Sequence, residues 1–362
     1  MSKKLIKIVF VLPSLGSGGA EKIMTFLAEN INSSLFEPIL LVVGCKSQTS
    51  YHVENVPVHY LNKSRVLFSV FPIISFFRNN KPDLVMSSVV HLNAMIALIS
   101  ILFPKIKFIG REASVLTEMA KFEPSSNLYF HKKLIQFSYR FFDKIICQSK
   151  DMATDLIENF KVSKQKITLI NNPITKKSSK VKTTTRTSKP IHLISVSRLS
   201  KEKGLDRMVA ILSQLKFPFK FTLIGKGVEK ENLFKQFEEK KLLKVMDYIP
   251  YTRDVESYLA IADVFLQTSY VDGFPNAVIE SCAVGTPVIA LSAPGGITEI
   301  IENGKNGYIV SSIEQFVDCL TKINDNYTFH PSLVSEVVYE RFNSALILKK
   351  YENVFIKIVN TK

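Results

Sequence analysis

Residues 264–290 read VFLQTSYVDGFPNAVIESCAVGTPVIA, a stretch that begins and ends with a short apolar run. Between these runs, Pro275 suits the first turn of a helix, because its missing N–H would lack a partner there in any case. Helix-compatible apolar spacing continues from Asn276 to Ala283, and a Gly-Thr-Pro turn at 285–287 precedes the second run. The stretch therefore predicts a strand, a helix and a second strand in succession.

Two carboxylates, Asp272 and Glu280, lie eight positions apart in this stretch. Asp272 falls in the loop before the helix, where unpaired N–H groups and the positive end of the helix dipole can face a phosphate. Glu280 falls within the helix and can hold a second part of the same ligand. A nucleotide sugar has suitable length, but ordinary surface acids on a strand-helix-strand unit account for the two residues equally well.

The same alternation of apolar runs and helical patterns extends over the whole chain. The expected strands are Leu5–Leu12, Ile39–Val43, Val56–Leu61, Leu84–Ser87, Lys107–Gly110, Lys144–Cys147, Ile167–Ile170, Ile191–Val196, Phe219–Ile224, Val245–Tyr248, Val264–Gln267, Pro287–Ala290 and Gly307–Val310. Near-continuous apolar runs indicate parallel strands covered on both faces. The expected fold class is α/β, with two doubly wound, Rossmann-like domains. In such sheets ligands bind beyond the carboxyl ends of the strands, and a cleft between two facing domains is the expected active site.

Length and charge suggest where one domain ends. A chain of 362 residues exceeds the size of most single cores. Residues 1–190 hold 27 Lys or Arg and 12 Asp or Glu, whereas residues 191–362 hold 20 of each. Nine of the bases fall between Lys161 and Lys189, a stretch without an acid. We predict an N-terminal domain at 1–175, a solvated basic linker at 176–190, a second domain at 191–345, and a C-terminal helix at 346–362 that packs back toward the N-terminal domain.

A basic first half predicts an anionic partner. Nucleic acid is not expected, because no zinc-finger spacing, RNA-binding strand pattern or helix-turn-helix signature is present. An anionic membrane surface fits the charge. The stretch from Arg65 to Arg78, RVLFSVFPIISFFR, has the composition of an interfacial segment, but an ordinary buried helix is the favoured interpretation.

The lengths of the apolar runs bear on the location of the protein, and the Cys, His and Asp patterns bear on its cofactors. Ile8–Leu12 is too short for a signal peptide, and Ala94–Phe103 is too short for a bilayer span, so a cytoplasmic protein is expected. The four cysteines are scattered, with neither a Cys-x-x-Cys pair nor clustered His, and no Asp-x-Asp signature occurs. We expect no metal ion and no other cofactor.

Two further strand-to-helix loops are candidates for ligand binding. Gly16, Gly18 and Gly19 follow the first strand and let the backbone approach a ligand, although they equally suit a tight turn. Arg198 and Lys203 follow the first strand of the second domain, five positions apart, and can converge on one anion; solvated surface bases are the alternative.

Taken in order, these motifs resemble those of the retaining glycosyltransferases of family 4, the glycosyl transferases group 1, which have the GT-B fold and use nucleoside-diphosphate sugars. The matching segments are Gly-Gly-Ala-Glu at 18–21, Arg-x4-Lys-Gly at 198–204, residues 263–269, Gly-Phe-Pro-Asn-Ala-Val-Ile-Glu at 273–280, Pro-Gly-Gly-Ile-Thr-Glu at 294–299 and Asn-Gly-Tyr-Ile-Val at 306–310. The resemblance spans nearly the whole chain.

The resemblance implies roles for individual residues. Arg198 and Lys203 bind the donor diphosphate, Glu280 holds the nucleotide ribose, and Asp272 faces the donor sugar. One carboxylate can accept hydrogen bonds from both ribose hydroxyls, which suits Glu280. Asp272, Arg198 and Lys203 are the candidate catalytic residues. The other candidate donor-binding residues are Gly18, Gly19, Gly273, Phe274, Pro275 and Asn276.

The chain departs from the family pattern in two places. Asp272 replaces the usual first Glu of a Glu-x7-Glu motif and is one methylene shorter. Where many members carry a His in an acceptor-domain loop, this chain has Arg111 and Glu112, and His91 is the nearest alternative. These three residues are the candidates on the acceptor side.

The implied reaction moves a hexose or N-acetylhexosamine from a UDP-sugar, with retention of configuration, to a glycan acceptor. A polyprenyl-diphosphate-linked glycan at the inner face of the membrane is the preferred acceptor. A nucleotide-sugar epimerase of the same architecture would act without an acceptor, and a non-catalytic nucleotide- or anion-binding module would release no UDP.

Overall fold

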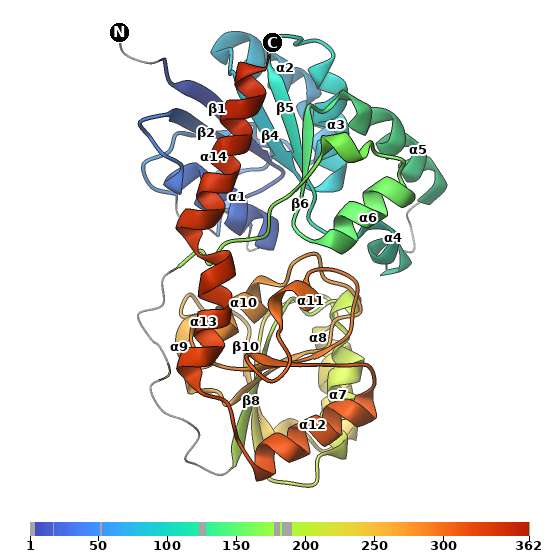
Figure 1. Cartoon of the computed structure of the whole chain (residues 1–362). Helices are drawn as coiled ribbons and strands as arrows, with labels where there is room; N and C mark the ends of the chain where they lie inside the picture. The colour runs from blue at the N-terminus through green and yellow to red at the C-terminus, as the bar shows by residue number, and fades with distance from the viewer. Residues whose placement is uncertain are drawn as a thin grey trace. The chain divides into compact units, whose positions relative to one another are not determined.

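The computed structural model describes residues 4–16, 18–50, 53–122, 128–176, 182 and 190–361. The chain divides into two compact units (Figure 1). Unit 1 combines the residues up to Thr175 with those from Ser344 onward, and unit 2 runs from Lys176 to Asn343.

Unit 1 is built on a parallel sheet of seven strands in the order β3-β2-β1-β4-β5-β6-β7. The strands are β1 (Ile6–Leu12), β2 (Phe36–Val42), β3 (Val58–Tyr60), β4 (Leu84–Ser88), β5 (Lys107–Arg111), β6 (Lys144–Cys147) and β7 (Ile167–Leu169). The α-helices are α1 (Gly19–Asn30), α2 (Val70–Asn80), α3 (Val90–Ser100), α4 (Leu116–Met119), α5 (Leu128–Ser138), α6 (Lys150–Glu158) and α14 (Ser344–Asn360). The short 3-10 helices are η1 (Lys46–Gln48), η2 (Val66–Ser69), η3 (Ala120–Phe122), η4 (Tyr139–Phe141) and η5 (Lys164–Lys166).

Unit 2 repeats the architecture with a parallel sheet of six strands in the order β10-β9-β8-β11-β12-β13. The strands are β8 (Ile191–Val196), β9 (Phe219–Ile224), β10 (Met246–Ile249), β11 (Val264–Gln267), β12 (Val288–Leu291) and β13 (Gly307–Val310). The helices are η6 (Lys201–Lys203), α7 (Leu205–Gln214), α8 (Lys230–Glu239), η7 (Leu243–Val245), α9 (Val255–Ile261), α10 (Asn276–Ala283), α11 (Ile297–Ile300), α12 (Ile313–Asp325) and α13 (Pro331–Phe342).

These two sheets confirm the predicted fold class. All thirteen expected strands form, with ends displaced by at most three residues. Side chains on both faces of the sheet are buried. Ile8 to Leu12 in β1 are fully buried at every position, as required of a parallel strand covered on both faces.

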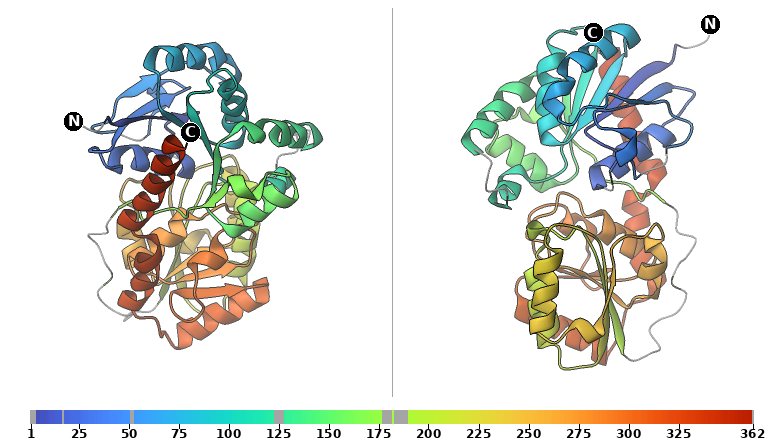
Figure 2. Two further views of the ribbon diagram at one scale, coloured as in Figure 1. Left: turned by 45° about the horizontal axis from the view of Figure 1, so that its top comes forward. Right: turned by 180° about the vertical axis from the view of Figure 1, so that it is seen from behind.

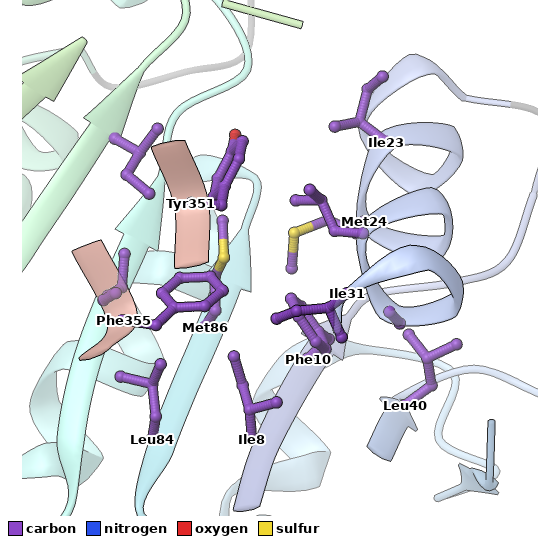
Figure 3. Close-up of a cluster of buried hydrophobic side chains, with 14 of the residues drawn as sticks. Ile8, Phe10, Ile23, Met24, Ile31, Leu40, Leu84, Met86, Tyr351 and Phe355 are labelled. Atoms are coloured by element: carbon purple, nitrogen blue, oxygen red, sulfur yellow. The ribbon is translucent and has the colours of Figure 1, made fainter. Parts of the chain in front are cut away.

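The C-terminal helix α14 completes the core of unit 1. It lies in front of the strands in Figure 1 and behind them in the right-hand view of Figure 2, along one face of the sheet. Its buried residues Ile347, Tyr351, Phe355 and Ile358 recur at helical spacing and belong to the hydrophobic core cluster of unit 1, in which Figure 3 shows Tyr351 and Phe355. The ring of Phe355 meets that of Phe10 edge-on, with centroids 6.3 Å apart.

Two expectations differ from what the described residues show. The segment at α2 is not an ordinary buried helix, because Phe71 is 82% exposed although Ile73 and Phe77 are buried. The predicted basic linker lies outside the described residues except for Lys176, Lys182 and Pro190. Lys182 is not solvated: its Nζ donates to the Ala262 carbonyl at 2.8 Å and pairs with Asp263.

Helices long and apolar enough to span a bilayer are absent from the described part of the chain.

Candidate functional site

Two of the predicted loops meet where the strand order of unit 2 reverses. β8 is followed in sequence by β9 and β10 on one side of the sheet, whereas β11 to β13 lie on its other side. Val264 and Phe265 of β11 pair directly with Leu193 and Ile194 of β8. The loops that leave the carboxyl ends of these two strands are therefore neighbours, at the position where open α/β sheets bind ligands.

The loop after β8 holds both predicted bases. Arg198 Nη2 donates to Glu202 Oε1 at 3.1 Å, and the hydroxyl of Ser200 donates to the same oxygen at 2.6 Å. The Glu202 side chain is buried, whereas that of Arg198 is 67% exposed. Glu202 thus fixes the turn from inside and leaves most of the guanidinium accessible to an anion.

Lys203 joins this loop to the one after β11. Its Nζ donates to Asp272 Oδ2 at 2.6 Å, and Gln267 Nε2 donates to the same oxygen at 3.3 Å. The hydroxyl of Thr268 donates to the Lys203 carbonyl at 3.2 Å, and the Tyr270 N–H donates to the Glu202 carbonyl at 2.8 Å. Two candidate catalytic residues that lie far apart in sequence are therefore in direct contact.

The turn from Gly273 to Asn276 leads into α10. Phe274 is buried, and its ring meets that of Phe342 edge-on, with centroids 5.5 Å apart. Its side chain therefore belongs to the core of unit 2. Pro275 caps α10, Asn276 begins it, and Glu280 is partly exposed one turn later. The helix bounds agree with the predicted Asn276–Ala283.

A third loop, after β12, supports Asp272 through its backbone. The Asp272 N–H donates to the Pro294 carbonyl at 3.1 Å, and Asp272 forms a parallel bridge with Gly295. Gly295 has φ +128°, and a Cβ built there would lie 1.5 Å from the Asp272 carbonyl oxygen. Only glycine fits a contact this close.

Gly18 and Gly19 lie at the start of α1 in unit 1. Gly18 is the N-cap residue, and its carbonyl accepts the first helical bond from the Lys22 N–H at 3.1 Å. The hydroxyl of Ser14 donates to Glu21 Oε1 at 3.3 Å. A Cβ at Gly18 would lie 2.1 Å from Glu21 Oε2, so this carboxylate folds back over the glycine.

The three candidates on the acceptor side have different surroundings. His91 is exposed in the first turn of α3, whereas Arg111 and Glu112 are each 1% exposed. Arg111 Nε donates to the Tyr351 hydroxyl at 3.3 Å and Nη2 donates to Asn172 Oδ1 at 2.5 Å. The guanidinium therefore links β5 to α14 within unit 1.

Glu112 is the centre of a buried polar network. Its Oε1 accepts hydrogen bonds from the Tyr139 hydroxyl and from Asn93 Nδ2, the latter at 2.9 Å. Its Oε2 is buried with no hydrogen-bond partner among the described residues. Burial raises the pKa of Glu112 above 4.5; nearby Asp155 acts in the same direction, and the two hydrogen bonds and Arg111 oppose it.

This raised pKa predicts a pH-dependent stability. A carboxyl whose pKa is higher in the folded than in the unfolded state stabilises the fold fully at pH values below its unfolded-state pKa. That stabilisation is lost as pH rises through the folded-state pKa. We expect Glu112→Gln to reduce the fall in the free energy of unfolding above pH 4.5. Urea unfolding across a pH series measures this, with exposed Glu37→Gln as the control; an unchanged pH profile for Glu112→Gln would contradict the interpretation.

Sequence reasoning missed residues that position the predicted ones: Glu202 contacts Arg198, Gln267 contacts Asp272, and Gly295 approaches the Asp272 backbone. Glu202 has a signal in the sequence, because it lies four residues after Arg198 at the spacing of an ion pair on a helical turn. Gln267 is a polar residue at the end of an apolar strand. Within the described ranges, no group of three His, Cys, Asp or Glu side chains could hold a metal ion.

Two protein-family models match the chain: Glycosyltransferase Family 4 over residues 17–177 and Glycosyl transferases group 1 over residues 176–333. An N-acetylgalactosamine-N,N'-diacetylbacillosaminyl-diphospho-undecaprenol 4-alpha-N-acetylgalactosaminyltransferase from Campylobacter jejuni is 29% identical over 326 residues, covering 84% of this chain and 86% of the relative. The amylovoran biosynthesis glycosyltransferase AmsD of Erwinia amylovora is 23% identical over 368 residues, covering 97% and 99%.

Solved structures show the same fold. HepE from Anabaena, in complex with UDP-glucose, superposes with a TM-score of 0.79 at 17% identity, covering 97% of this chain and 99% of HepE. The lipopolysaccharide outer core galactosyltransferase WaaB superposes with a TM-score of 0.77 at 17% identity, covering 97% and 99%. Because the two family models adjoin and together span most of the chain, the protein belongs to the glycosyl transferases group 1 and has the GT-B fold.

Proposed function

We propose that this glycosyltransferase moves a hexose or N-acetylhexosamine from a UDP-sugar to a lipid-linked glycan, with retention of anomeric configuration. The observation that carries the proposal is the cluster of Arg198, Lys203 and Asp272 at the reversal of strand order in unit 2. Two cations and a carboxylate there match a donor with a diphosphate on one side and a sugar on the other.

In the proposed mechanism, Arg198 and Lys203 stabilise the negative charge of the departing UDP. Their donors are held in place before the substrate binds, Arg198 by buried Glu202 and Lys203 by Asp272. Preorganised charge of this kind is the largest catalytic contribution in many enzymes. These two side chains supply the positive charge at the leaving group, and neither a metal ion nor an enzyme nucleophile takes part in the proposed reaction.

The carboxylates of Asp272 and Glu280 have separate roles in the proposed reaction. Glu280, on α10, accepts hydrogen bonds from the ribose hydroxyls. Asp272 holds the Lys203 ammonium in position through one carboxylate oxygen and faces the donor sugar. The backbone of residues 273–276 lines the donor, and Gly18 and Gly19 stay assigned to donor binding. Of the acceptor-side candidates His91, Arg111 and Glu112, His91 is proposed to contact the acceptor, because it is exposed whereas the other two are each 1% exposed.

The named properties of relatives support the donor and the acceptor. HepE has been solved with UDP and with UDP-glucose. The Campylobacter relative is named as a transferase acting on a diphospho-undecaprenol-linked sugar. We therefore propose a polyprenyl-diphosphate-linked acceptor in polysaccharide biosynthesis, and a cytoplasmic protein that works at the inner face of the membrane.

The purified protein is tested with a panel of UDP-sugars and a membrane lipid extract, with UDP release as the measurement. We expect one of the UDP-sugars to support UDP release, and only when the lipid extract is present. EDTA should leave that release unchanged. The anomeric configuration of the product then tests retention. Conversion of a UDP-sugar without extract would indicate an epimerase instead, and binding without release under any condition would indicate a non-catalytic module.

A further inference from the structure

Three large apolar side chains are exposed where η2 leads into α2 in unit 1. Leu67 is 74% exposed, Phe68 58% and Phe71 82%. Single exposed apolar residues are normal, but three large ones within five positions mark a candidate interaction surface. We call these three residues the η2–α2 patch.

The patch belongs to a helix that the fold holds by its other side. Ile73 and Phe77 are buried, and the Phe77 ring meets that of Phe108 on β5 edge-on, with centroids 6.0 Å apart. Ser69 is also buried, and its hydroxyl donates to the Val66 carbonyl at 2.6 Å. The η2–α2 patch is therefore presented by an anchored element.

Positive charge flanks the patch on both sides in sequence. Residues 61–82 contain Lys63, Arg65, Arg78 and Lys81 and no Asp or Glu. Arg65, Arg78 and Lys81 are exposed. Aromatic and aliphatic side chains that insert at the boundary of a bilayer, with basic side chains at the anionic headgroups, are typical of interfacial segments.

We propose that the η2–α2 patch docks onto an anionic lipid surface. The inference rests on the proposed function, since a lipid-linked acceptor is presented at such a surface, and it names the part of unit 1 that reaches it. A second copy of the chain is a poorer partner: symmetric pairing of the patch would place its flanking bases near those of the other copy.

Flotation with vesicles tests the proposal, using phosphatidylcholine alone or mixed with phosphatidylglycerol, and without any glycan acceptor. We expect binding to the anionic vesicles that weakens as salt rises. The triple variant Leu67→Ser, Phe68→Ser, Phe71→Ser should bind at least about tenfold more weakly, since three apolar side chains lose their burial. A matched variant, Val228→Ser, Ile261→Ser, Leu333→Ser, removes exposed apolar side chains from unit 2 and should bind as the wild type does.

UDP release is measured for the same proteins with the membrane lipid extract dissolved in detergent. If the triple variant loses flotation and keeps release, both the patch and the transfer reaction are supported. Wild-type release without flotation overturns the docking surface alone, and flotation without release overturns the transferase proposal alone. Equal flotation of the two triple variants, or concentration-dependent dimerisation that the patch variant abolishes, also overturns the docking surface.

Discussion

Lys203→Ala is expected to lower kcat/KM for sugar transfer by at least about 100-fold, the effect of removing one preorganised charge donor from a transition state. The ammonium is fixed by Asp272 at 2.6 Å and so is in position before the donor arrives. Most of the loss should fall on kcat, because charge on the leaving diphosphate grows as the glycosidic bond breaks. Initial rates of UDP release at varied donor concentration measure both parameters.

Lys201→Ala is the matched control. Lys201 lies on the same 3-10 turn, η6, and is exposed, so the substitution removes one positive charge from the same loop without disturbing the contact with Asp272. We expect its kcat/KM to stay within about threefold of the wild type, as an exposed charge is largely screened. Equal losses in the two variants would show that only the general charge of the loop matters.

Gly295→Ala is expected to destabilise the protein by about 2–5 kcal/mol and to impair transfer in the folded fraction. The residue has φ +128°, and the added methyl would overlap the Asp272 carbonyl, which lies 1.5 Å from the Cβ position. To fit, the loop after β12 must move away from the loop that holds Asp272. Urea unfolding and UDP release at a temperature where the variant is folded measure the two effects.

Gly304→Ala separates backbone strain from this overlap. Gly304 also has positive φ, at +82°, but its Cβ would have only the Tyr308 hydroxyl nearby, at 4.0 Å. We expect a loss of about 1–2 kcal/mol from the left-handed backbone and no effect on transfer. If Gly295→Ala behaves in the same way, the close approach to Asp272 has no functional importance.

The fold class could be predicted because parallel strands have a strong signature in sequence. Runs such as Ile8–Leu12 and Val264–Leu266 are apolar at every position, and that pattern requires cover on both faces of a sheet. The apolar pattern at α2 was less informative. Phenylalanines recur throughout Val70–Asn80, and only the packed structure shows that Phe77 is buried and Phe71 exposed.

The site was predicted as separate loops, and the contacts between them were not. Lys203 and Asp272 are 69 residues apart, and their contact depends on β8 pairing with β11. Sequence spacing does not give strand order. The approach of Gly295 to Asp272 likewise arises from the neighbouring loop after β12, and a Pro-Gly-Gly turn in a sequence does not indicate which backbone its glycines will approach.

The course of α14 also bears on the order in which the two units can form during synthesis. Unit 2 is a single continuous segment, whereas the core of unit 1 includes Tyr351 and Phe355 from α14. On the ribosome, the first unit to emerge is therefore left with part of its hydrophobic surface uncovered until the whole of unit 2 has been translated. Unit 2 can therefore fold before unit 1 is complete. During that interval the uncovered apolar surface of unit 1 is accessible to chaperones.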